Sequence, residues 1–149
     1  MTDPLWLSAD QQRIWRAYLA GVARVSEYLD ADLRQHGLSL GEYEVLVCLS
    51  EADGERLRMA ELADMVHSSR SKLSHTIARM ERRDLVFRTS DCADGRGVYA
   101  GLTPEGRALL ESAAPDHVAA VRRILVDAVG PRDYSALGRA MEAVAAVAD

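Results

Sequence analysis

The sequence predicts a mainly helical (α+β) fold with a single β-hairpin between helical segments. Apolar residues recur at steps of three and four over most of the 149 residues, which is the spacing of one side of an amphipathic helix. The period changes only over residues 85–103, where two short β-prone runs flank a turn. Hydrophobic residues make up 48% of the chain and aromatic residues only 5%, so we expect an aliphatic core.

A long helix is predicted over residues 9–36, with Gly37 as its stop signal. Its apolar stripe comprises Ile14, Trp15, Tyr18, Leu19, Val22, Val25, Leu29 and Leu33. Ser39 and Glu42 then have the spacing of a capping box, in which each side chain accepts a hydrogen bond from the other residue's amide. A second helix should start there and end at Asp53-Gly54.

A short third helix is predicted from Met59 to Val66, and Ser68 or Ser69 can cap a fourth. Leu73, Ile77 and Met80 form the buried side of this fourth helix. Its opposite side carries Arg70, Ser71, Ser74, His75 and Ala78, and no acidic residue occurs before Glu81. A polar, cation-rich outer side of this kind suits a DNA groove.

Strands are predicted over residues 85–90 and 98–102, joined by a turn over residues 91–97. Thr103-Pro104 opens the next helix, with Thr103 as its cap and proline where no amide donor is needed. Pro115 should bend or interrupt this helix. Gly130-Pro131 separates a last helix, whose apolar stripe has the spacing of a coiled-coil seam. That stripe comprises Tyr134, Leu137, Met141, Val144 and Ala148.

Charge is distributed unevenly along the chain. The formal net charge of −5 taken whole argues against a nucleic-acid partner. Residues 67–90, however, hold six Lys+Arg and two Asp+Glu, a net charge of +4. The segments 1–66 and 91–149 have net charges of −6 and −3. A basic island on an acidic body is typical of a nucleic-acid reader, although a solvated helix face would look similar.

Several protein classes are disfavoured. No apolar run is long enough to span a membrane and no secretory leader is visible, so we expect a cytoplasmic protein. The two cysteines lack metal-site spacing, the four histidines are dispersed, and no cofactor motif is present. We find no catalytic grouping of Ser, His and Asp, no phosphate loop and no suitably spaced carboxylate pair, so we do not expect an enzyme.

The predicted order of elements is that of a winged helix-turn-helix with helical ends, and two motifs resemble the MarR family of bacterial transcriptional regulators. Residues 71–86, SKLSHTIARMERRDLV, are similar to that family's recognition helix and the start of its wing. Asp94-Gly95-Arg96, followed by Leu102-Thr103-Pro104-Glu105-Gly106-Arg107, is similar to its wing tip and next helix. Two residues depart from the pattern: His75 on the outer side, and Asp84 in place of the usual glycine. Asp84 can adopt the left-handed conformation at tolerable cost.

The resemblance implies a homodimer that binds a pseudo-palindromic double-stranded DNA operator. It places dimerisation helices at residues 1–36 and 104–149, and a winged helix-turn-helix domain at residues 37–103. The recognition helix, about residues 69–83, would enter the major groove, and the wing, about residues 85–103, would reach the minor groove. The two amphipathic terminal segments also need a partner surface. We expect a repressor that a small phenolic or carboxylate ligand releases from its operator.

The candidate DNA-binding residues carry cations or hydroxyl and imidazole groups. They are Ser69, Arg70, Ser71, Lys72, Ser74, His75, Arg79, Arg88 and Arg96. Arg96, at the wing tip, is the strongest single candidate, and Asp94 would hold it or cap the turn. Arg79 has an alternative role, in which it pairs with an acid and braces the recognition helix.

Ligand-binding and redox roles are alternatives that the sequence leaves open. Trp15, Arg16, Tyr18, His36 and Tyr43 are candidates for an effector pocket. The alternative, which the sequence favours, is that the aromatic residues belong to the core and that His36 interacts with the dipole at a helix end. Cys92, in the wing turn near two arginines, is the candidate for a redox switch. Cys48 is expected to be inert core. A winged-helix protein-interaction module without DNA binding is the remaining alternative.

Overall fold

The computed structural model describes residues 5–90 and 97–148, and its chain divides into two compact units. The helical unit comprises residues 1–32 and 118–149, and the winged unit comprises residues 33–117. Leu110 and Ala113, which follow the predicted boundary at residue 104, pack in the core of the winged unit. Among the described residues, no helix is both long enough and apolar enough to cross a membrane.

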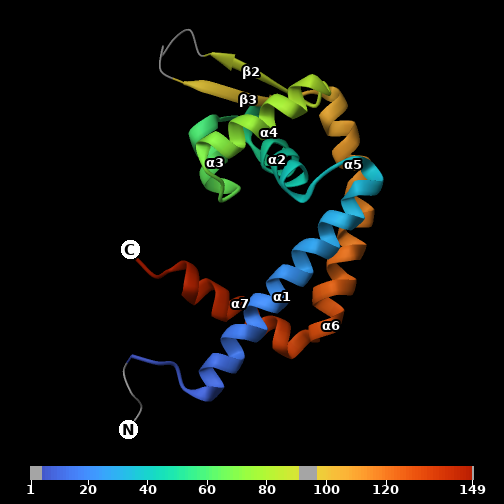
Figure 1. The fold of residues 1–149 in the computed structure, drawn as a ribbon. Helices are drawn as coiled ribbons and strands as arrows, with labels where there is room; N and C mark the ends of the chain where they lie inside the picture. The colour runs from blue at the N-terminus through green and yellow to red at the C-terminus, as the bar shows by residue number, and fades with distance from the viewer. Residues whose placement is uncertain (1–4, 91–96, 149) are drawn as a thin grey trace. The chain divides into compact units, whose positions relative to one another are not determined.

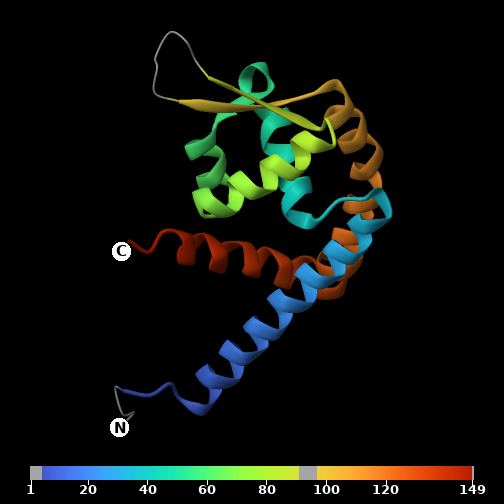
Figure 2. The same ribbon diagram turned by 45° about the horizontal axis from the view of Figure 1, so that its top comes forward.

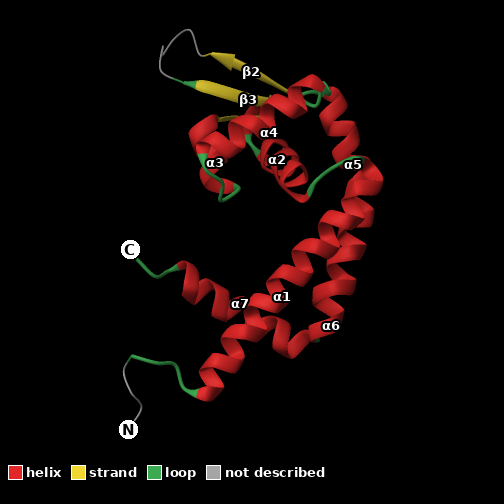
Figure 3. Cartoon of the chain, viewed as in Figure 1, coloured by secondary structure: helices red, strands yellow, loops and turns green. Residues whose placement is uncertain are grey.

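In the described part of the chain, helices dominate both units and the β-strands lie in the winged unit (Figure 3). The winged unit contains the helices α2 (Leu40–Glu51), α3 (Met59–Met65) and α4 (Arg70–Arg82), the strands β1 (Arg56–Arg58), β2 (Val86–Ser90) and β3 (Val98–Leu102), and the 3-10 turns η1 (Arg34–His36) and η2 (Asp53–Glu55). The helical unit contains most of α1 (Ala9–Leu33), the π-helical turn η3 (Arg122–Val126), α6 (Asp127–Val129) and α7 (Pro131–Ala145). The helix α5 (Pro104–Val121) begins in the winged unit and ends in the helical unit.

The predicted helix boundaries of α1 and α2 are close to those observed. The helix α1 ends at Leu33, three residues early, and the 3-10 turn η1 continues to His36 before Gly37 turns the chain at φ +69°. The capping box is present, because the Ser39 hydroxyl accepts from the Glu42 amide at 3.1 Å and the Glu42 carboxylate accepts from the Ser39 amide at 3.1 Å. Ser39 thus starts α2 at the predicted residue.

The sheet has three strands, in the order β1-β3-β2, and all its pairs are antiparallel. The strands β2 and β3 run side by side as the predicted hairpin (Figures 1 and 2), with Val86 opposite Leu102 and Ser90 opposite Val98. Residues 91–96 of the predicted turn lie outside the described residues. The strand β1 was not predicted, because three residues are too few to show an alternating pattern.

The core of the winged unit is aliphatic, as the composition predicts. Its most deeply buried side chains come from α1, α2, α3 and α4 and from the turn before α2. They are Leu33, Leu38, Val45, Leu46, Leu49, Leu62, Leu73, Ile77 and Met80. Burying a leucine of this size contributes about 1.5–3 kcal/mol to the free energy of unfolding, so this cluster dominates the stability of the unit. Tyr43 is the one aromatic residue in the cluster within the described ranges.

The wing is tied to α5 at one buried hydroxyl group. The Thr103 hydroxyl donates to the Asp84 carbonyl at 2.6 Å and accepts from the Gly106 amide at 2.9 Å, so it also caps α5. Asp84 adopts the left-handed conformation that the sequence analysis allowed for it, with φ +57°. A Cβ atom on Gly106 would lie 2.1 Å from the Leu85 carbonyl oxygen, so only glycine permits this close approach.

The helix α5 continues through Pro115 without a break, so of the two predicted effects, a bend or an interruption, the interruption does not occur. Pro115 lies on the exposed side of the helix, where water can satisfy the carbonyl group that loses its intrahelical partner. The α-helical hydrogen-bond pattern changes seven residues after Pro115, at the π-helical turn Arg122–Val126. There the Arg123 guanidinium donates to the Tyr28 hydroxyl of α1 at 2.9 Å.

Replacing Thr103 by valine should lower the free energy of unfolding by about 1–3 kcal/mol. The substitution keeps the shape of the side chain but leaves the Asp84 carbonyl and the Gly106 amide without their partner. Urea denaturation followed by circular dichroism measures the loss. Thr89→Val, on β2, is the matched control, because the Thr89 hydroxyl makes only a 3.5 Å contact with the adjacent carbonyl. Equal stability of the two variants would contradict this role for Thr103.

Candidate nucleic-acid interface

The helix α4 presents one buried and one exposed side, as its sequence predicts. Ser69 is the cap, and its hydroxyl accepts from the Lys72 amide at 3.1 Å. Leu73, Ile77 and Met80 are buried. The helix also carries polar and basic residues that are exposed, apart from the half-buried Ser74. They are Arg70, Ser71, Lys72, Ser74, His75 and Arg79.

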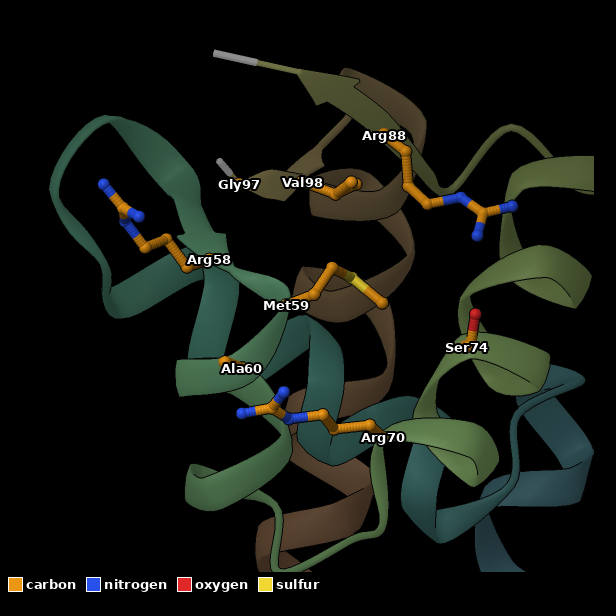
Figure 4. Close-up of a pocket in the computed structure, with 8 residues that line it drawn as sticks. All are labelled: Arg58, Met59, Ala60, Arg70, Ser74, Arg88, Gly97 and Val98. Carbon is orange, nitrogen blue, oxygen red and sulfur yellow. The ribbon is translucent and has the colours of Figure 1, made fainter. Parts of the chain in front are cut away.

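A basic groove of about 360 Å³ lies between α4, the start of α3 and the sheet (Figure 4). Its lining consists of Arg58, Met59, Ala60, Arg70, Ser74, Arg88, Gly97 and Val98. The three arginines come from three different elements: Arg58 from β1, Arg70 from the first turn of α4, and Arg88 from β2. No Asp or Glu occurs in this lining among the described residues. Arginine side chains along the wall of a groove can bind phosphate oxygens, although the three guanidinium groups point in different directions here (Figure 4).

The arginines of β1 are functional candidates that the sequence analysis missed. The guanidinium carbons of Arg56 and Arg58 lie 5.2 Å and 5.3 Å from the centre of the Tyr99 ring, within the range of cation–π attraction. Arg58 is the direct cross-strand neighbour of Tyr99. Tyr99 thereby orders two long side chains at the edge of the wing. The sequence signal was the alternation Arg-Leu-Arg, which is too short to identify a strand by itself.

Two of the predicted DNA-contacting arginines also form ion pairs within the chain. The Arg88 Nε atom lies 2.6 Å from Glu81 Oε1, which joins β2 to α4. The Arg79 Nε atom lies 3.7 Å from Glu42 Oε1, so Arg79 has the bracing contact that the sequence left open as its alternative role. Arg96, Asp94 and Cys92 lie outside the described residues, and their roles stay predictions.

The predicted ligand-binding residues are divided between the two units. Trp15, Arg16 and Tyr18 belong to the helical unit, where the Trp15 and Tyr18 rings stack at 5.7 Å. Their positions fit the exposed apolar stripe of α1 rather than a closed core, because Trp15 is 48% and Tyr18 41% exposed.

His36 and Tyr43 belong to the winged unit, and both contact α5. His36 Nε2 lies 2.9 Å from Asp116 Oδ2, and the Tyr43 ring lies 4.3 Å from the His117 ring. Burial raises the pKa of the Tyr43 hydroxyl above its ordinary value. These contacts give both residues a structural role in the winged unit.

Cys48 lies against the core of the winged unit, as predicted, and is half-buried. Burial, followed by the negative charges of Glu51 and Glu44, raises the pKa of its thiol. A raised pKa disfavours the thiolate form that reacts with oxidants. In the described part of the chain, no group of three His, Cys, Asp or Glu side chains is arranged to hold a metal ion.

Comparison with known proteins identifies the family. The model of the MarR family matches residues 38–98. The fold is similar to that of AbsC, a MarR family transcriptional regulator from Streptomyces coelicolor, with 41% identity, coverage of 94% of this chain and 95% of that chain, and a TM-score of 0.89. It is also similar to Sco3205, a MarR family regulator from the same organism that was solved in complex with DNA. That match has 40% identity, coverage of 94% and 89%, and a TM-score of 0.90.

A more distant structure shares the fold. CouR from Rhodococcus jostii RHA1, solved with bound p-coumaroyl-CoA, is 23% identical, with coverage of 95% of this chain and 96% of that chain and a TM-score of 0.75. The winged fold, the basic groove and the similarity to AbsC over nearly the whole of both chains lead to one conclusion. The chain belongs to the MarR family of transcriptional regulators.

Proposed function

We propose that this regulator is a dimeric repressor that binds a pseudo-palindromic DNA operator. The observation that carries the proposal is the basic groove beside an α4 whose exposed side is polar and cationic. In this proposal α4 lies in the major groove, where Ser71, Ser74 and His75 contact base edges or phosphates. The wing lies along the minor groove, with Arg96 at its tip.

Phosphate contacts would come from the groove and from the start of α4. Arg58 and Arg70 line the groove, and Lys72 is exposed on the first turn of α4. The Ser69 cap also places the amino-terminal end of α4, with its partial positive charge, on this side. Such contacts hold the protein in register on the duplex, and the base contacts then select the sequence.

The dimer proposal rests on the apolar surface of the helical unit. Side chains of the α1 stripe and of α7 remain exposed in the single chain, among them Trp15 at 48%, Val22 at 48% and Val144 at 61%. Two apolar grooves of about 550 and 480 Å³ lie on this unit, and residues of both α1 and α7 line each of them. Exposed apolar area on this scale marks an interaction surface, and a second copy of the chain would cover it.

The effector proposal extends the family resemblance to a small phenolic or carboxylate ligand. Trp15 and Tyr18 offer aromatic surface, and Arg16 offers a cation for a carboxylate. The proposal is supported by CouR, which shares this fold and was solved with bound p-coumaroyl-CoA. Release from DNA requires the ligand to bind the DNA-incompetent form of the dimer more tightly than the competent form.

DNA binding should weaken steeply with salt. Selection of genomic fragments with the purified protein gives the operator, and titrations at several salt concentrations give the slope of log K against log[salt]. In a dimer, Arg58→Gln, Arg70→Gln and Arg96→Gln should each reduce the magnitude of that slope by about 2, because each removes one phosphate contact per subunit. Arg139→Gln is the control with the same charge change, since Arg139 is exposed on the side of α7 away from its apolar stripe. Binding that is undetectable or insensitive to salt would overturn the proposal.

An aspartate in the apolar stripe of α1 should dissociate the dimer. Val22→Asp places a charge on a surface that the partner would desolvate, so the variant should sediment as a monomer while the wild type sediments as a dimer. Ala20→Asp is the matched control, because Ala20 is exposed on the opposite side of the same helix. Sedimentation velocity measures both. A wild-type monomer at micromolar concentration, or a dimer unaffected by Val22→Asp, would contradict this interface.

An aromatic acid should lower operator affinity. Titration of the operator complex with salicylate, 4-hydroxybenzoate and p-coumarate, followed by fluorescence anisotropy, should show release by at least one of them, and Arg16→Gln should raise the concentration that is needed. Benzyl alcohol, which has the ring without the acid, is the control. Identical operator affinity with and without every one of these acids would refute the effector proposal.

A further inference from the structure

One buried carboxylate joins the start of α2 to the recognition helix α4. The side chain of Glu42 is only 10% exposed. Its Oε2 atom accepts from the Ser39 amide at 3.1 Å and lies 3.5 Å from Arg83 Nη1, while its Oε1 atom lies 3.7 Å from Arg79 Nε. Both carboxylate oxygens therefore face a cation, although a capping box needs only one oxygen.

The two arginines lie on successive turns of α4. Arg79 lies in the last turn of α4 and Arg83 is its C-cap residue. The two positions are four residues apart, so they lie on one side of the helix. Glu42 contacts both of them from α2 and thereby restrains the carboxyl-terminal half of α4 at two points. The buried stripe of Leu73, Ile77 and Met80 already anchors the helix along its length. The carboxylate is thus placed to fix the rotation of the helix rather than to make it fold.

Arg83 extends this connection to the chain reversal after α1. A Cβ atom on Gly37 would lie 3.2 Å from Arg83 Nη2, so the guanidinium group packs against the backbone of that reversal. Gly37, with φ +69°, is the residue at which the chain leaves α1 and η1 and turns toward the Ser39 cap. The start of α2, the reversal after α1 and the recognition helix therefore meet at one carboxylate and its two arginines.

We propose that Glu42 is a positioning residue for operator recognition, which holds α4 at the angle that base readout requires. The proposal rests on the proposed DNA-binding function and adds a distinction between two kinds of binding. Specific binding needs the correct helix angle, because base contacts are directional. Non-specific binding depends on charge, and a negative charge near the DNA only weakens it.

The variant Glu42→Gln separates these two effects. Glutamine keeps the size of the side chain and an acceptor oxygen for the Ser39 amide, but it removes the charge that holds both arginines. Affinity for the selected operator should fall about tenfold, a typical coupling between distinct sites. Affinity for a random-sequence duplex should rise or stay equal. Loss of a merely structural residue would lower both affinities together.

The control is Glu44→Gln, on the same helix and with the same change in net charge. Glu44 is exposed, and no ion pair of its side chain is recorded among the described residues. The operator and the random-sequence duplex should each bind Glu44→Gln with an affinity equal to or slightly higher than that for the wild type. The ratio of specific to non-specific affinity should therefore stay at the wild-type value. A ratio that changes equally in both variants would overturn the positioning role.

Hydrogen exchange provides a readout that is independent of DNA. Amides in the carboxyl-terminal half of α4 should exchange faster in Glu42→Gln than in the wild type, and at the wild-type rate in Glu44→Gln. If Glu42→Gln does not fold, Arg83→Gln tests the same contact from an exposed position and should also lower the affinity ratio. A wild-type protein with no sequence preference would refute the proposed function, whereas unchanged exchange in α4 would refute the positioning role.

Discussion

The burial of one apolar side of α4 is the constraint on which the rest of the winged unit depends. Leu73, Ile77 and Met80 are sealed in the same aliphatic cluster as the leucines of α2 and α3. Because these three residues occupy one side of a short helix, the residues on the opposite side are left facing solvent. The rotation of α4 thus decides which side chains can meet DNA, and the stripe, the Ser69 cap and the Glu42 contacts all determine that rotation.

Local sequence signals, such as helix caps and the spacing of apolar residues, predicted most of the fold. Caps such as Ser39, Ser69 and Thr103 act on amides three residues away, so their effect can be inferred without tertiary information. The hairpin followed from a change of period, and the left-handed Asp84 from its tolerance of that conformation. The sequence did not show that the helix continues through Pro115, because the effect of a proline on a helix depends on whether water reaches the freed carbonyl group, which the tertiary structure decides.

The candidate site was harder to predict than the fold, because it depends on residues that are distant in sequence. Arg58 enters the groove through a three-residue strand, and its partner Tyr99 is 41 positions further along the chain. The ion pairs of Arg79 and Arg88 were also invisible in a charge count, which weights every cation equally. The net charge of +4 over residues 67–90 therefore overstates the positive charge that this segment offers to a phosphate. The arginines of β1 lie outside the segment and contribute further positive charge.

The π-helical turn at Arg122–Val126 has a consequence for comparing this chain with its relatives. A π-helical turn takes up one residue more than an α-helical turn, so it shifts the side chains that follow it in the same helix, up to the break at Gly130, by about 100° around the helix axis. The apolar residues of α5, before the turn, are therefore out of phase with those of α6, after it. A relative with a regular helix here would align correctly only with a one-residue gap within residues 122–126. Without that gap, equivalent interior residues would be matched to exterior ones through α7.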